Sequence, residues 1–395
     1  MFSARAAKQL FYFLMAVAII TPHDLYAQSG FSTNGAVQVS VGVNTTGPTN
    51  GSFAPVSPPN GNFVIFASDA DNLVSNDTNQ RRDVFQYSPD KPIELVSVVA
   101  TTGQFPTGGD SEGPAVSPVL PDGSYAIAFL SNAADLVPGY QAPNGNPKQV
   151  YIRLPKTNET LLVSAAPNIS GGSGFAGAAS PCRQLSITAL PNPNRYIVAF
   201  QSDASNLEPQ LPALTSKTIF LTTLTTTNGK TIITSPPQSA RRDNGIPYEG
   251  DLRDPSISGD GRWVAFNSAA PILGVGNGFQ QMYLYNRTSK ILRMISHNAQ
   301  GDLGDGDSLG GSVSFQAEKV SFLTTATNLL PGSSQTRKAY QFDTAKKSFI
   351  HVNTSSSNEV SNGDAFGASM SPNGRLVVFS DNGTNLVPDT ATNNK

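Results

Sequence analysis

The stretch Asp254-Pro-Ser-Ile-Ser-Gly-Asp-Gly-Arg-Trp-Val-Ala-Phe266 reads as a β-strand, a tight turn and a second strand. Its Asp-Gly dipeptide tolerates positive φ and joins adjacent antiparallel strands. The second strand ends in a phenylalanine. Strings of the same kind end in phenylalanine at five other places: Phe66, Phe129, Phe200, Phe322 and Phe379. The chain is therefore built from one imperfect β repeat.

Each copy of the repeat continues in the same way. A leucine follows seven residues after every repeated phenylalanine, at Leu73, Leu136, Leu207, Leu273, Leu329 and Leu386. A third strand alternates around an aromatic residue, and an outer strand completes most copies. Four short strands in about 60 residues are the content of one propeller blade. We predict that the repeated Phe and Leu side chains form the core between blades.

The fold class that follows is all-β, a six-bladed β-propeller of four-stranded antiparallel blades. The sixth copy has its Phe379 strand and Leu386 loop, but lacks a third strand before Lys395. We expect this sixth blade to be incomplete and closed by the N-terminal strand Val37-Gln-Val-Ser-Val41, which resembles an outer strand. A longer natural protein that continues beyond Lys395 is the alternative.

The N-terminus predicts export. Arg5 and Lys8 precede an apolar run, Leu10 to Ile20, which is shorter than the ~20 residues that span a bilayer. We interpret residues 1–27 as a signal peptide cleaved near Ala27, with an uncleaved anchor as the alternative. Residues 28–36 form a short linker and 37–395 the propeller. The mature protein is expected in the periplasm or outside the cell.

Charge and composition exclude some partners. Of the 395 residues, 14% are charged and the formal net charge is −2, so nothing attracts the chain to nucleic acid. No segment after the predicted cleavage site is long and apolar enough to span a membrane. We expect a monomer whose partner is a protein or a glycan.

Two copies resemble a known repeat family. The segment 254–266, with Ser-Gly-Asp-Gly-Arg-Trp-Val-Ala-Phe, and Ser371-Pro-Asn-Gly-Arg-Leu-Val-Val-Phe379 are similar to the PD40 repeat of TolB-like six-bladed propellers. The resemblance covers about 37 to 395. It implies a periplasmic protein that contacts other proteins, although the architecture hosts binding proteins, scaffolds and enzymes alike.

Candidate catalytic residues are few. Gly306-Asp-Ser308-Leu-Gly310 matches a nucleophile motif, but Gly109-Asp-Ser111 occupies the equivalent loop of another copy, so we interpret the motif as structural. His297 and His351 are the only histidines after the predicted cleavage site, and both fall at the ends of outer strands. We interpret Cys182, the only cysteine, as a buried apolar residue rather than a reactive thiol. No catalytic, cofactor-binding or metal-binding residue is predicted.

Two further patterns have structural interpretations. The loops Asp69-Ala-Asp-Asn72, Asn76-Asp-Thr-Asn79 and Asp302 to Asp307 are rich in oxygen ligands, but lack the spacing of a calcium loop. We expect no cofactor, with calcium as the open alternative. Arg81-Arg82-Asp83 and Arg241-Arg242-Asp243 are interpreted as charges at blade edges.

The sequence therefore favours an exported, non-enzymatic propeller that serves as a protein- or glycan-binding or scaffold module. The alternative is a hydrolase or lyase that acts on polysaccharide or peptide with carboxylates in the central channel. Two carboxylates about 5–10 Å apart at the channel mouth would favour the enzyme.

Overall fold

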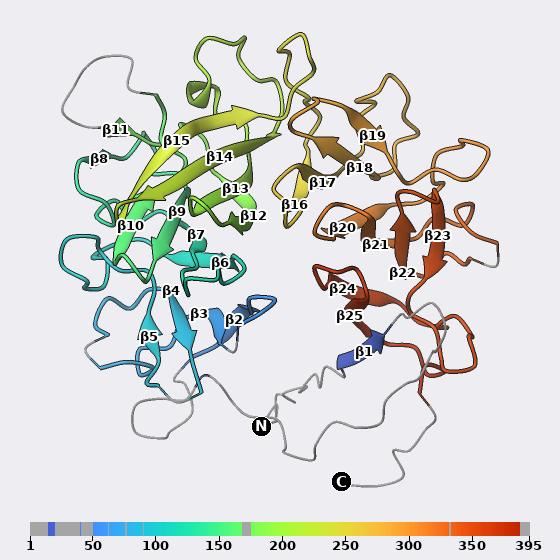
Figure 1. Cartoon of the computed structure of the whole chain (residues 1–395), viewed down its shortest axis with the longest axis horizontal. Helices are drawn as coiled ribbons and strands as arrows, with labels where there is room; N and C mark the ends of the chain where they lie inside the picture. The colour runs from blue at the N-terminus through green and yellow to red at the C-terminus, as the bar shows by residue number, and fades with distance from the viewer. Residues whose placement is uncertain are drawn as a thin grey trace, which may run out of the picture.

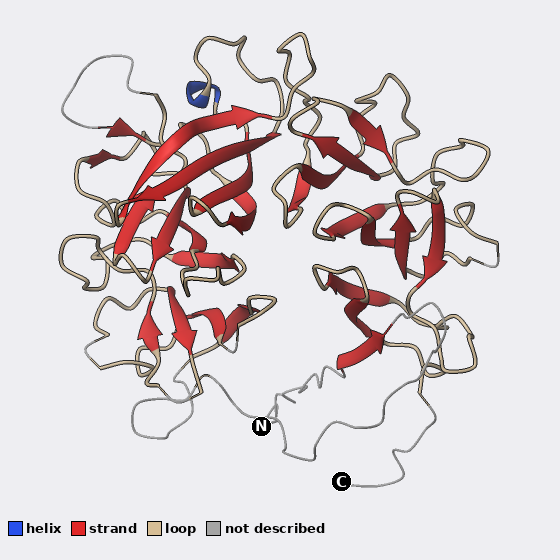
Figure 2. Cartoon of the chain, in the orientation of Figure 1, coloured by secondary structure: helices blue, strands red, loops and turns tan. Residues whose placement is uncertain are grey.

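The computed structural model describes residues 15–19, 40, 50–61, 63–75, 77–89, 91–167, 175–331 and 333–387. These residues form an all-β propeller, in which twisted antiparallel sheets surround a central axis (Figure 1). Figure 2 shows that strands and loops make up almost all of it, with one 3₁₀ turn, η1 (Ser205–Leu207). The predicted all-β propeller of four-stranded antiparallel sheets is confirmed.

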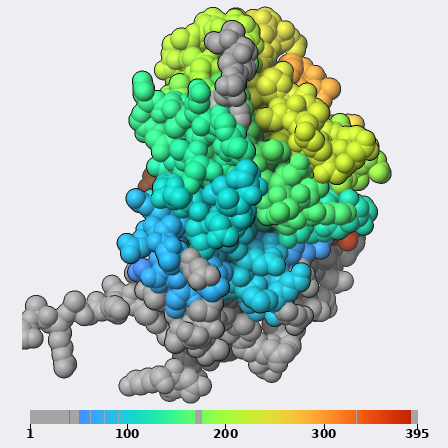
Figure 3. Space-filling model, turned by 90° about the vertical axis from the view of Figure 1, so that its left-hand side faces the viewer, coloured from blue at the N-terminus to red at the C-terminus, as the bar shows by residue number. Residues whose placement is uncertain are grey.

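Five sheets of the described residues have four antiparallel strands each. The first and second sheets consist of β2 (Ser52–Val56), β3 (Val64–Ser68), β4 (Asp83–Tyr87) and β5 (Glu94–Leu95), and of β6 (Ser111–Val116), β7 (Ile127–Ser131), β9 (Gln149–Leu154) and β10 (Glu159–Leu162). The third consists of β12 (Arg183–Leu190), β13 (Arg195–Ser202), β14 (Thr218–Thr227) and β15 (Lys230–Ser239). Figure 3 shows the residues of this part of the chain following one another across one side of the molecule, from blue through cyan to green.

The fourth and fifth sheets follow the same order. They consist of β16 (Arg253–Ile257), β17 (Trp263–Ser268), β18 (Gln281–Asn286) and β19 (Leu292–Met294), and of β20 (Ser308–Val313), β21 (Lys319–Thr324), β22 (Lys338–Asp343) and β23 (Ser348–His351). A parallel pair outside the sheets joins β8 (Tyr140–Gln141) to β11 (Phe175–Ala176). In each of these five sheets the strand nearest the axis comes first in the chain (Figure 1).

The repeated phenylalanines lie in the second strand of each sheet and are all buried. Four of the repeated leucines are buried with them, and Leu386 is half-buried. Leu273 is the exception, because its side chain is 42% exposed while the preceding Ile272 is buried in its place. The prediction of a core role was therefore wrong for Leu273, the one copy whose leucine follows Ile rather than Asn or Asp.

The last sheet has three strands in the order β1-β25-β24, namely β1 (Met15–Ile19), β25 (Leu376–Asp381) and β24 (Ala365–Met370). Met15 pairs with Ser380 and Ile19 with Leu376, so β1 takes the place next to β25 that a third strand takes elsewhere. This strand lies inside the predicted signal peptide 1–27. The segment Val37–Val41, predicted to close the ring, lies outside the described residues except for Ser40. The role of this segment stays a prediction, as does the count of six blades with an incomplete sixth.

Every innermost strand has a bulge near its start, where one residue adopts positive φ. The residue before each bulge pairs with the residue directly after the repeated phenylalanine, so these six residues are equivalent. We call them the bulge ring; they are Phe53, Glu112, Arg183, Arg253, Leu309 and Phe366. Three are apolar and three are charged, and the charged ones come from consecutive sheets.

Candidate functional site

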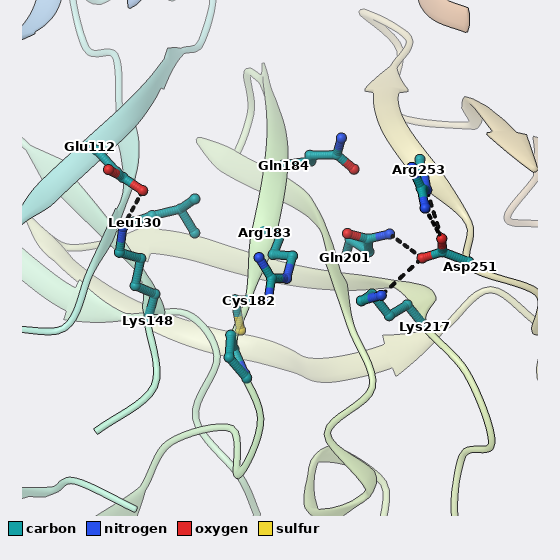
Figure 4. A pocket seen from close by; sticks show the side chains of 11 residues that line it. Glu112, Leu130, Lys148, Cys182, Arg183, Gln184, Gln201, Lys217, Asp251 and Arg253 are labelled. Atoms are coloured by element: carbon teal, nitrogen blue, oxygen red, sulfur yellow. Dashed lines mark hydrogen bonds and ion pairs between the residues drawn. The ribbon is translucent and has the colours of Figure 1, made fainter. Parts of the chain in front are cut away.

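A pocket of about 480 Å³ opens where the charged half of the bulge ring lies. The starts of β6, β12 and β16 supply Glu112, Arg183 and Arg253 (Figure 4). The residues just before β9 and β14 supply Lys148 and Lys217. Innermost and third strands run in the same direction within an antiparallel sheet, so their starts meet at one end of the propeller. Three sheets therefore present charged side chains to one pocket.

A first group of charges surrounds Glu112. Its carboxylate forms an ion pair with Lys148 of the same sheet. It also accepts a hydrogen bond of 3.2 Å from Nη1 of Arg82, which belongs to the first sheet. Both acceptor oxygens are thus engaged by cations.

A second group surrounds Asp251, whose carboxylate accepts a bond of 3.1 Å from Lys217 Nζ and one of 2.7 Å from Arg253 Nε. Gln201 Nε2 lies 3.3 Å from the same carboxylate. Burial raises the pKa of Asp251, but the hydrogen bonds from Arg253 and Lys217 outweigh burial, and the pKa lies below its ordinary value. Asp251 therefore stays ionised.

Arg183 lies between the two groups and is exposed (Figure 4). Within the part of the chain that the structure describes, its guanidinium forms neither an ion pair nor a hydrogen bond, whereas both carboxylates of the pocket are paired. Four cationic side chains and two carboxylates line the pocket, so the lining carries a net charge of +2. The pocket is thus a cationic site with one unpaired guanidinium.

The reason lies in the repeat. Four of the other five copies place an aspartate two residues before the bulge-ring residue, at Asp110, Asp251, Asp307 and Asp364, and the first copy has Gly51 there. The third copy has Pro181 at that place, followed by Cys182, which is buried. No carboxylate is therefore available from its own loop to neutralise Arg183.

The structure gives the Gly-Asp-Ser motif a packing role. Ser308 is fully buried, and its hydroxyl donates to Thr324 Oγ1 over 3.1 Å. Asp307 accepts a bond of 2.8 Å from the backbone N–H of Gln280 in the preceding sheet. Ser111 bonds Ser131 in the same way over 3.1 Å. The motif thus fastens one sheet to the next.

The two histidines lie apart from the pocket lining. His297 Nδ1 is 2.9 Å from the carbonyl oxygen of Asn298. His351 lies edge-on to Tyr340, with ring centroids 4.6 Å apart, and burial lowers its pKa. Among the described residues, no group of three His, Cys, Asp or Glu side chains could hold a metal ion.

One charged group differs from the prediction. Asp83, interpreted as an edge charge, is fully buried at the start of β4, because its carboxylate accepts bonds from Ser97 and Asn79. Arg82 is fixed across two sheets by Asp69 and Glu112. Carboxylates of the acidic loop Asp302 to Asp307 also have protein donors. Asp302 Oδ2 accepts from the Asn298 amide over 3.0 Å, and Asp305 accepts from the N–H and the hydroxyl of Thr327, each at 2.5 Å.

The site residues Lys148, Arg183, Lys217 and Arg253 were missed by sequence reasoning. One sequence pattern could have pointed to part of the site. The residue two positions after the Asp of each repeated Gly-Asp pair varies between copies, as Glu112, Arg253, Leu309 and Phe366. The third copy lacks the Gly-Asp pair, and its hairpin is longer than that of the fourth. Arg183 therefore falls out of register in any simple alignment of the copies.

No helix among the described residues has the length and hydropathy needed to cross a membrane.

Comparison with known proteins adds little about activity. No family model and no curated protein matches the sequence. Solved structures that match include TolB from Acinetobacter baumannii, with 13% identity, a TM-score of 0.37 and coverage of 84% of this chain and 54% of that one. An acylaminoacyl peptidase of Pyrococcus horikoshii has 12% identity and a TM-score of 0.35 over 81% of this chain and 47% of its own.

A Hadza microbial sialidase matches with 9% identity and a TM-score of 0.39, over 84% of this chain and 66% of its own. The chain thus spans about half the length of the TolB and peptidase chains. At such low identities and TM-scores, these matches do not separate a binding protein from an enzyme. The propeller assignment rests on the sheets themselves, and the PD40 repeat remains a resemblance.

Proposed function

We propose that this protein is an exported, non-enzymatic binding module that holds an anionic group of a protein or glycan partner in the pocket between its second, third and fourth sheets. One observation carries the proposal. Arg183 presents an unpaired guanidinium to the pocket, while Glu112 and Asp251 are already paired. An incoming anion can therefore bind the Arg183 guanidinium without first displacing a carboxylate of the protein from it.

The chemistry of the pocket suits a carboxylate. A guanidinium offers donors in a planar fork that matches a carboxylate in two parallel hydrogen bonds. Lys148 and Lys217 flank Arg183 and are each about one-third exposed. Their charges raise the local positive potential even though each is paired. The site is open to water, so its affinity is expected to fall as ionic strength rises.

The enzymatic alternative, a hydrolase or lyase of polysaccharide or peptide, needs a carboxyl group that keeps its proton near neutral pH. Asp251 has a lowered pKa and is bonded to two cations. Glu112 is bonded to two cations as well. Neither carboxylate is arranged as a general acid, which is why binding is the preferred function.

The cellular setting belongs to the same proposal. Residues 1–27 would be removed on export to the periplasm or beyond, and the mature monomer would act without a cofactor. Sequencing the N-terminus of protein isolated from the cell envelope and the medium tests this. A mature chain that starts near Gln28 supports export, and a chain that retains Met1 contradicts it.

Isothermal titration tests the binding function with two probes, a glutamate-rich peptide and an oligogalacturonate. Replacement Arg183→Gln should lower the affinity for whichever probe the wild type binds by about tenfold or more, because a charged hydrogen-bond pair is lost. The matched control is Arg262→Gln, which removes an exposed arginine whose only ion pair is 3.9 Å long. Equal affinity of wild type and Arg183→Gln would refute the proposal, and so would the failure of both probes to bind.

Incubation of both probes with the protein tests the alternative directly. Intact probes after prolonged incubation are expected. Cleavage that is lost in Glu112→Gln or Asp251→Asn would replace the binding function by a hydrolase or lyase.

A further inference from the structure

An exposed aromatic ring on the first sheet is linked to the pocket through one arginine. Phe53, the bulge-ring residue of β2, is 43% exposed. The Arg82 Cζ atom lies 4.6 Å from the centroid of its ring. Nη1 of the same arginine bonds Glu112 of the pocket over 3.2 Å. Arg82 therefore lies between the pocket and Phe53 and contacts both.

The position of Phe53 is fixed before any ligand arrives. Arg82 donates to Asp69 from Nε over 2.8 Å and from Nη2 over 3.0 Å, in addition to its bond with Glu112. A guanidinium held at three nitrogens loses little freedom on binding, and its cation–π contact holds the phenyl ring against it. A large aromatic group that is exposed and held in place is the kind of residue that anchors a partner.

We propose that the partner group bound at this face is a peptide segment that carries an acidic residue and, spaced so as to reach from the third sheet to the first, an aromatic or aliphatic residue. The carboxylate would bind Arg183, and the apolar side chain would pack on Phe53. This inference rests on the function proposed above and names its ligand class.

The surroundings of Phe53 favour a peptide over a sugar. Sugar binding at an aromatic ring needs hydrogen-bond donors and acceptors beside the ring for the hydroxyl groups. The guanidinium of Arg82, which lies against the Phe53 ring, already directs three nitrogens at Asp69 and Glu112. An apolar side chain satisfies this surface without requiring a further donor.

Fluorescence anisotropy with three labelled peptides tests the inference. One carries glutamates around a phenylalanine, one has alanine in place of the phenylalanine, and one has glutamine in place of the glutamates. Wild type should prefer the first over the second by about tenfold. Phe53→Ala should abolish that preference and leave the affinity for the alanine peptide unchanged. Circular dichroism and thermal melting establish that each variant is folded.

Phe366→Ala is the matched control. Phe366 occupies the same bulge-ring position, is 39% exposed, and its ring centroid lies 5.7 Å from Arg337 Cζ. Among the described residues, no ion pair joins Arg337 to the residues that line the pocket. This variant should retain the preference for phenylalanine. A preference lost equally in Phe366→Ala would overturn the assignment to Phe53.

The outcomes separate the two proposals. Equal binding of the first two peptides, with Arg183→Gln still weakening both, overturns only the aromatic contact. Absence of binding by any glutamate peptide overturns the peptide ligand. Binding of oligogalacturonate that weakens in Phe53→Ala would replace the peptide by a glycan.

Discussion

Gln184 and Asp254 lie in adjacent sheets and hold two bulges together: the backbone N–H of Asp254 donates to Gln184 Oε1 over 3.0 Å, and the Gln184 amide donates to the Asp254 carboxylate. Both residues have positive φ, of 41° and 50°. Each follows a site arginine directly, Arg183 in one strand and Arg253 in the other. This reciprocal pair therefore sets the spacing of the two guanidinium groups.

Replacement Gln184→Ala should lower the free energy of unfolding by about 1 kcal/mol, since two hydrogen bonds at an exposed position are lost. It should also weaken binding of a glutamate peptide, because the bulges are no longer tied together. Urea unfolding and titration of the peptide measure the two effects. Gln316→Ala, at an exposed turn, is the control and should change neither quantity. Unchanged peptide affinity in folded Gln184→Ala would show that the pair does not position the arginines.

The buried carboxyl group of Asp83 should make the folded protein less stable as pH rises from acid toward neutral. Burial raises the pKa of Asp83 to about 7, because its effect is larger than that of the hydrogen bonds from Ser97 and Asn79, which lower the pKa. A folded-state pKa above the unfolded value of 3.8 means that the folded state holds the proton more tightly. The stabilisation is complete below that unfolded value and is lost as pH rises toward about 7. The loss should be about 4 kcal/mol at most.

Asp83→Asn isolates this contribution. An amide suits the position, because Gln149 and Gln281 occupy it in other sheets and accept from Ser164 and Ser296 as Asp83 accepts from Ser97. Urea unfolding at several pH values between 4 and 8 gives the free energy of unfolding as a function of pH. The decrease of this free energy with rising pH should disappear in the variant. The control Asp302→Asn, at an exposed loop, should keep the slope. An unaltered slope in Asp83→Asn would refute the assignment.

Cys182 should be inert in the folded protein. Its side chain is 1% exposed, and burial raises the pKa of the thiol to about 12. The thiolate is the reactive form, so iodoacetamide at pH 8 should label the native protein far more slowly than the protein unfolded in guanidinium. Mass spectrometry over time measures both rates. Labelling at the same rate in the two states would contradict the buried position.

A chain that begins at Gln28 lacks β1, and with it the partner of β25 on one side. Amide hydrogens of Leu376–Ser380 that β1 would protect should then exchange faster than those of β21 (Lys319–Thr324), which is paired on both sides. Hydrogen exchange with mass spectrometry compares the two strands. Equal protection would show that another segment, such as Val37–Val41, completes the sheet.

The sequence predicted the propeller because the fold depends on residues that every copy must keep. Phe129 and Phe266 fill equivalent core positions, and Asp260-Gly261 forms the expected hairpin turn. The pocket could not be predicted in the same way, because it depends on residues in which the copies differ. Arg183 is unpaired because its copy lost an aspartate, and Phe53 joins the site only through Arg82 of the same sheet. Such relations between sheets become visible only when the ring is assembled.

The proposed binding function depends on Arg183 as the free cation that receives an anionic group. A crystal structure of the protein with the glutamate–phenylalanine peptide tests this role most directly. We expect a peptide carboxylate within about 3 Å of the Arg183 guanidinium nitrogens. A carboxylate bound instead at the separate pocket that Lys346 and Arg375 line, with Arg183 untouched, would contradict it.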